Sequence, residues 1–115
     1  MAANKFARGD VWLANFDPVQ GREQAGSRPC LIVSADGLNR SRAELVIVVP
    51  LTSKFKNIPS HVAIKPPEGN LKVASYAMCE AVRSISTFRL TDFWGTVSKE
   101  TLEEVAEKLR LLLEL

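Results

Sequence analysis

The chain has 115 residues, of which 46% are hydrophobic and 24% are charged. This length is typical of one domain, at roughly 100–200 residues per domain, so we expect residues 1–115 to form a single unit. The composition excludes a disordered chain, which combines low hydrophobicity with high net charge. Fifteen basic and thirteen acidic residues leave a net charge of +2, which is too small to identify a nucleic-acid-binding protein by itself.

The sequence also predicts where in the cell the protein lies and whether its cysteines form a disulfide. No apolar run approaches the roughly 20 residues of a membrane-spanning helix, and the N-terminal residues lack the apolar core of a signal peptide. We therefore expect a cytoplasmic protein.

Cys30 and Cys79 each lie in an apolar run, which predicts buried thiols rather than a disulfide. One histidine and two cysteines are few ligands for a zinc site, so we expect neither a metal nor another cofactor.

Short apolar runs separated by turn signals predict a mainly β protein, either a barrel or a sandwich. The predicted strands cover residues 11–16, 28–34, 45–49, 61–65, 73–79, 82–85 and 93–97. The run 45–49 is the strongest, because four β-branched residues in a row favour a strand that is buried on both faces. We expect this strand to end at Pro50, since proline has no N–H to donate. A turn or short helical piece is predicted over 35–39.

The last segment has a helical period. Its apolar residues recur at spacings of three and four and predict one buried helix face, formed by Leu102, Val105, Leu109 and Leu112. Ser98 is the predicted N-cap of this helix. Residues 98–115 contain five acidic and three basic residues, which leaves twelve basic and eight acidic residues in the β part.

Two polar loops lie in this more basic part of the chain. The first covers residues 19–27 and is longer than a plain connection, which is typical of a functional loop. The second covers residues 52–60, and each loop adjoins the end of an apolar strand. Guanidinium, ammonium, hydroxyl and amide groups together suit an anionic, hydrogen-bonding ligand such as a phosphodiester. The alternative interpretation is that both loops are ordinary solvated segments.

Motifs of several common enzyme classes are missing from the sequence. There is no Gly-x-Ser-x-Gly nucleophile elbow and no phosphate-binding loop ending in Lys-Ser/Thr. His61, the only histidine, begins an alternating strand, a position where a structural role is commoner than a catalytic one. Trp12 and Trp94 also lie in strand runs, and we interpret both as core or dimer-contact residues.

Several blocks of the sequence resemble the MazF/PemK-type toxins of bacterial toxin–antitoxin pairs. The most specific are Gly21-Arg22-Glu23-Gln24-Ala25-Gly26-Ser27-Arg28-Pro29 and Val49-Pro50-Leu51-Thr52-Ser53. Further matches are Gly9-Asp10-Val11-Trp12, Phe16-Asp17-Pro18, Cys79-Glu80-Ala81-Val82-Arg83-Ser84-Ile85-Ser86 and Gly95-Thr96-Val97. The resemblance covers nearly the whole chain in order.

This resemblance implies a homodimer of SH3-like β-barrels with added helices. It also implies a metal-independent endoribonuclease that cuts single-stranded RNA at short motifs, and a cognate antitoxin that blocks it. Attack by the RNA's own 2′-hydroxyl would leave a 2′,3′-cyclic phosphate and a 5′-hydroxyl.

The resemblance also implies which residues act. Arg28 and Thr52 match the usual active-site pair. Glu23 is the expected proton acceptor, with Glu80 as a competitor; either carboxylate is alternatively an ion-pair partner for neighbouring cations. The expected substrate-binding residues are Arg22, Gln24, Ser53, Lys54, Phe55, Lys56 and Glu80. Phe55 lies between two lysines, an arrangement that suits base stacking as well as a simple loop anchor.

Two other functions stay open. One is a toxin-fold binding module that acts by protein contact, as gyrase-directed toxins do. The other is a silent relative that only binds its antitoxin, since activity depends on side-chain placement to within about 0.5 Å.

Overall fold

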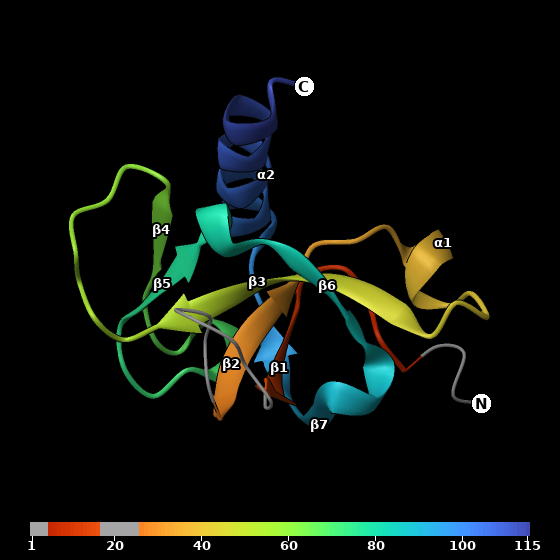
Figure 1. Cartoon of the computed structure of the whole chain (residues 1–115). Coiled ribbons are helices and arrows are strands. Elements are labelled where there is room, and N and C mark those ends of the chain that lie inside the picture. Colours follow the sequence, from red (N-terminus) through yellow and green to blue (C-terminus); the bar gives the residue numbers. More distant parts are fainter. Residues whose placement is uncertain (1–4, 17–25) are drawn as a thin grey trace.

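The computed structural model of the chain describes residues 5–16 and 26–115. Its strands are β1 (Asp10–Asn15), β2 (Ser27–Ile32), β3 (Leu45–Thr52), β4 (His61–Ile64), β5 (Ser75–Met78), β6 (Arg83–Ser86) and β7 (Leu90–Thr96). Its helices are α1 (Asp36–Asn39) and α2 (Lys99–Leu113), with single 3₁₀ turns η2 (Glu68–Asn70), η3 (Cys79–Ala81) and η4 (Thr87–Arg89). The predicted mainly β fold with a C-terminal helix is confirmed (Figure 1).

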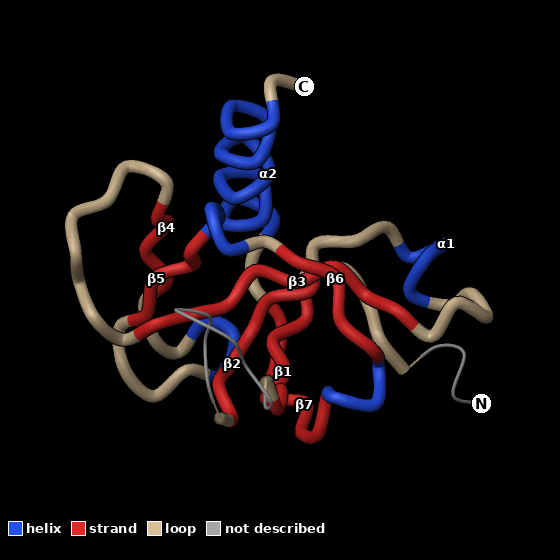
Figure 2. Tube along the Cα trace, viewed as in Figure 1, coloured by secondary structure: helices blue, strands red, loops and turns tan. Residues whose placement is uncertain are grey.

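The strands form one antiparallel sheet in the order β4-β5-β3-β2-β1-β7, with β6 paired to the first half of β3. Strands dominate the chain trace (Figure 2). Within the described residues no pairing joins β4 to β7, so the sheet stays open where a closed barrel was expected. Both end strands therefore keep an unpaired edge.

Strand β3 does not end at Pro50, as the sequence predicted, but continues to Thr52. It pairs with β6 over Leu45–Val48 and with β5 from Leu51 onward. Pro50 lies where the partner on this edge of β3 changes from β6 to β5. The missing N–H of proline therefore removes no hydrogen bond of the sheet on this edge. This continuation carries Thr52 to the end of a rigid strand.

The core has two parts, one on each face of the sheet, because successive side chains of a strand point to opposite faces. One face buries Val11, Leu31, Val49 and Leu51 against Val105 of α2. The opposite face is buried in a second cluster, which comprises Trp12, Ala14, Phe16, Cys30, Ile32, Val46, Val48, Ile85 and Leu90. The prediction that the strand at 45–49 is buried on both faces is confirmed.

Helix α2 covers only part of the sheet. Leu102 and Leu109 pack against the first cluster, but Leu112, predicted to lie on the same buried face, is 45% exposed. Figure 1 shows the reason: the C-terminal turns of α2 project past the strands. No helix in the described part of the chain is both long and apolar enough to span a membrane.

Both cysteines are buried, as predicted, and neither forms a disulfide. Burial raises the pKa of the Cys30 thiol to about 12 and that of Cys79 to about 11. Because the thiolate is the reactive form, both thiols are inert at neutral pH.

The N-cap of α2 supplies a first test. The Ser98 hydroxyl accepts a hydrogen bond from the Thr101 N–H at 3.1 Å, as the sequence predicted. We expect Ser98→Ala to lower the free energy of unfolding by about 1 kcal/mol, the usual value of a lost cap. Urea unfolding followed by circular dichroism measures the change. Ser84→Ala, at an exposed serine of β6, is the matched control, and an equal loss in both variants would contradict a capping role.

Candidate active site

Arg28 and Thr52 come together through the pairing of β2 with β3. These strands are antiparallel, with Cys30 opposite Pro50 and Leu31 opposite Val49. Arg28 lies two residues beyond Cys30 in β2, and Thr52 lies two residues beyond Pro50 in β3. The two residues that the family resemblance joined therefore lie at the same end of this strand pair.

Thr52 is held in place by its own loop. Its side chain is nearly buried, at 8% exposure, and its Oγ1 accepts a hydrogen bond from the Lys54 N–H at 3.2 Å. A hydroxyl has one donor and two acceptor positions. Because the Lys54 bond uses an acceptor position, the hydroxyl hydrogen of Thr52 stays available for an anionic oxygen.

Arg28 borders a pocket of about 220 Å³. The pocket floor is apolar, since Leu51 and Leu71 belong to the core. Among the described residues, its lining is Arg28, Pro29, Leu51, Ser53, Leu71, Lys72, Val73, Ser75 and Trp94. Sequence reasoning anticipated Arg28 and Ser53 here but missed Lys72, which follows a turn and carries no motif. The pocket combines an apolar base with cations at its edge.

The second polar loop extends the site on the other side of Thr52. Lys54, Phe55 and Lys56 are all exposed. Phe55 is 68% exposed, and its ring lies beside that of Tyr76, with 5.5 Å between the ring centroids. Tyr76 is a further residue that sequence reasoning missed, because only the strand pairing places it here.

Glu80 is held by neighbours of its own. Ser60 donates a hydrogen bond to Glu80 Oε1 at 2.5 Å, and His61 Nε2 lies 2.8 Å from Oε2. The His61 side chain is only 5% exposed, whereas that of Glu80 is 41% exposed. Both carboxylate oxygens thus have partners, which favours the ion-pair interpretation of Glu80 over the role of proton acceptor.

The pKa of Glu80 reflects two opposing effects. Burial raises it, but the hydrogen bonds from Ser60 and His61, acting together, bring the pKa below its usual range. A carboxylate whose pKa is lowered by folding stabilises the fold above its unfolded pKa of about 4.3. That contribution is lost as the pH falls through the folded pKa.

We therefore expect Glu80→Gln to be less stable than the wild type at pH 7, with a gap that shrinks as the pH falls below about 4. Urea unfolding at a series of pH values measures the gap. Glu104→Gln is the matched control, since Glu104 is exposed on α2 and forms no salt bridge within the described residues. A gap that stays constant with pH would mean that Glu80 acts through packing rather than charge.

The remaining predicted site residues, Arg22, Glu23 and Gln24, lie outside the described residues. Their expected roles stay predictions.

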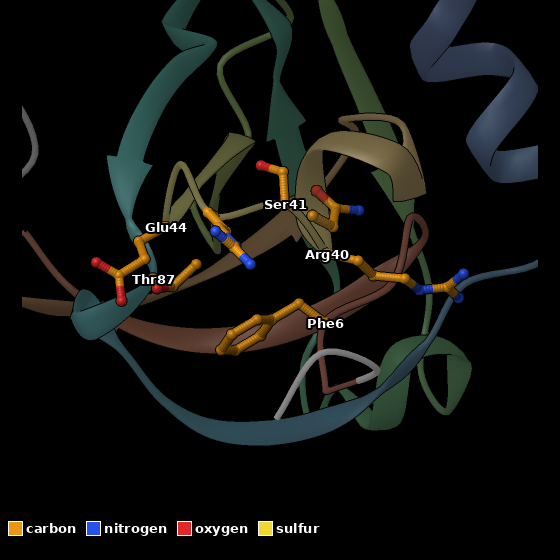
Figure 3. Close-up of a pocket in the computed structure, with 7 residues that line it drawn as sticks. Phe6, Arg40, Ser41, Glu44 and Thr87 are labelled. Carbon is orange, nitrogen blue, oxygen red and sulfur yellow. The ribbon is translucent and has the colours of Figure 1, made fainter. Parts of the chain in front are cut away.

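A second pocket, of about 300 Å³, lies near the opposite end of β3. Figure 3 shows Phe6 on one side of it and Ser41 on the other, with Glu44 and Thr87 close together. One of its two arginines, Arg40, lies 3.9 Å from the carboxylate of Asp36. None of the predicted site residues in the described part of the chain lines this pocket, so we place the candidate active site at Arg28 and Thr52.

Comparison with known proteins agrees with this fold. Residues 7–113 match the family described as PemK-like, MazF-like toxin of type II toxin-antitoxin system. The chain belongs to this family of toxins.

Individual relatives are similar over almost their whole length. Endoribonuclease MazF9 of Mycobacterium tuberculosis is 35% identical over 113 residues, which are 94% of this chain and 96% of the relative. MazF of Deinococcus radiodurans, form I, superposes with a TM-score of 0.79 at 32% identity, covering 95% of this chain and 96% of that one. An endoribonuclease from a mycobacterial species, solved in complex with its cognate antitoxin, has a TM-score of 0.77 at 26% identity, covering 97% and 96%.

Proposed function

We propose that the protein is an endoribonuclease that cuts single-stranded RNA at short motifs without a metal ion. The observation that carries this proposal is that β2 and β3 bring Arg28 and Thr52 to the same end of their strand pair. A permanent cation and a hydroxyl donor side by side can hold the two non-bridging oxygens of one phosphate. The similar endoribonucleases named above support the same activity.

The proposed chemistry uses the 2′-hydroxyl of the RNA as the nucleophile. Glu23 accepts the 2′-hydroxyl proton, and the resulting oxygen attacks the adjacent phosphorus. The bond to the 5′-oxygen breaks, and that oxygen takes up a proton from solvent water and leaves as a 5′-hydroxyl. The other product carries a 2′,3′-cyclic phosphate. Arg28 and Thr52 stabilise the charge that builds on the phosphorane, which is the part of such reactions where fixed donors contribute most.

The other predicted residues are proposed to bind the RNA around this phosphate. Ser53, Lys54 and Lys56 offer a hydroxyl and two ammonium groups on the loop after β3. Arg22 and Gln24 would contact the same strand of RNA from the loop before β2. Cations along a groove attract the RNA backbone without regard to sequence.

The proposed partners follow from the family. We propose a homodimer in the cytoplasm, inhibited by a cognate antitoxin that covers the RNA site. A disordered, acidic antitoxin segment would be drawn to the same cations as RNA, so that binding of one excludes the other.

Incubation with a long single-stranded RNA in excess EDTA tests the proposal. The expected result is a set of discrete cuts whose ends carry a cyclic phosphate and a 5′-hydroxyl. Thr52→Val is the matched variant, because it keeps the branched shape of the nearly buried side chain and removes only the hydroxyl. We expect it to cut far more slowly. A folded wild-type protein that cuts none of several RNAs would favour a binding module or a silent relative instead.

A further inference from the structure

Tyr76 extends the row formed by Arg28 and Thr52. In β5, Tyr76 lies directly opposite Thr52, on the side of β3 away from β2. Opposite residues of antiparallel strands share a face, so Thr52 and Tyr76 lie side by side, with Arg28 at the same end of the neighbouring strand β2. Neighbouring strands are about 4.8 Å apart. A phosphate held between Arg28 and Thr52 therefore has Tyr76 one strand further along.

Phe55 completes an aromatic surface with Tyr76. The two ring centroids are 5.5 Å apart, and the ring planes are inclined by 54°. The bond from the Lys54 N–H to Thr52 Oγ1 fixes the start of the loop, one residue before Phe55. Although Phe55 is 68% exposed, its ring is thus held against Tyr76 beside the candidate site.

Tyr76 contributes a hydroxyl to this surface. Tyr76 is half-buried, and no hydrogen bond of its hydroxyl is seen among residues 5–16 and 26–115. Residues 51–60 contain two lysines and no acidic residue. Exposed aromatic rings flanked by cations are how proteins hold unstacked bases of single-stranded RNA.

We propose that the base next to the cleaved phosphate stacks on the ring pair of Phe55 and Tyr76, and that the Tyr76 hydroxyl donates or accepts a hydrogen bond at the edge of that base. Tyr76 is then a specificity-determining residue. This inference rests on the proposed function, because it assumes that the site binds single-stranded RNA. The inference adds where the neighbouring base binds and which residue selects that base.

Binding of RNA tests the ring pair without cleavage. The probe is a fluorescent single-stranded RNA of mixed sequence, about the length of one site, and each variant carries Arg28→Ala so that the RNA stays intact. Phe55→Ala and Tyr76→Ala are expected to weaken binding about 5- to 150-fold, the range for one stacked base. The salt dependence should not change, since no charge is removed. Phe88→Ala is the matched control, because Phe88 is an exposed phenylalanine at the opposite end of β3.

Cleavage tests the hydroxyl in the wild-type background. Tyr76→Phe keeps the ring, so its KM should stay within a few-fold of wild type, whereas its preference for one base beside the cut should relax. Phe55→Trp should rescue what Phe55→Ala loses. A merely structural role of the pair would predict lower thermal stability with unchanged motif and KM.

The outcomes separate the two proposals. Unchanged RNA binding and an unchanged motif in both alanine variants of an active enzyme would overturn the ring-pair inference and leave the proposed function intact. A wild-type protein that binds RNA through the ring pair but cuts none would contradict the proposed function alone. Since Phe55 is exposed, its alanine variant decides the question even if Tyr76→Ala does not fold.

Discussion

Replacing Arg28 with alanine is expected to reduce the rate of RNA cleavage by about 10²–10³-fold, the usual effect of removing one donor that stabilises transition-state charge. Arg28 is the second residue of β2, at an exposed position, and lies at the same end of the β2–β3 pair as Thr52. The measurement is single-turnover cleavage of an RNA that carries the wild-type motif, with saturating enzyme. Saturation separates the chemical step from RNA binding.

Arg28→Lys is the informative companion variant. It keeps the positive charge but loses the planar fork that holds two oxygens at once. We expect a rate between those of wild type and Arg28→Ala, with RNA binding close to wild type. Full activity of Arg28→Ala, in a protein that melts like the wild type, would remove Arg28 from the mechanism.

Replacing Glu23 or Glu80 with glutamine distinguishes between these two candidate proton acceptors. We expect Glu23→Gln to slow cleavage by about 10²–10⁴-fold, the range for a lost general base. Glu80→Gln should change the rate much less, because Ser60 and His61 occupy both of its carboxylate oxygens. Cleavage rates of the two variants, compared at equal saturation with RNA, give the answer.

The pH dependence of the same reaction supplies the control. If Glu23 accepts the proton, the acidic limb of the rate profile should disappear in Glu23→Gln and persist in Glu80→Gln. A larger loss in Glu80→Gln would make Glu80 the base and its contact with His61 part of the mechanism. Small and equal effects would exclude both carboxylates.

Much of the fold was predictable because it depends on local patterns. The spacing of Val105 and Leu109 predicts a helix, and Ser98, as its N-cap, predicts where this helix begins, since capping involves neighbours in the chain. The run at 45–49 predicts a strand buried on both faces, since its residues are apolar without alternation. These features need no knowledge of what packs against them.

The end of β3 was not predictable in this way. Proline usually ends a strand because it cannot donate to a ladder. At Pro50 the partner strand changes from β6 to β5, so no hydrogen bond between strands is missing on that edge of β3. Only the order of strands in the sheet, which involves segments far apart in the chain, determines this.

The sequence by itself determined the residue types of the candidate site, Arg28 and Thr52 among them, and the presence of the strands that carry them. Only the tertiary structure decided which residues are neighbours. The pairing of β3 with β2 brings Thr52 to the same end as Arg28, and its register with β5 sets Tyr76 opposite Thr52. The pairing of β4 with β5 brings His61 near Glu80 instead. The physical reason is the two-residue period of a strand: a shift of one residue in any register would turn each of these side chains to the opposite face.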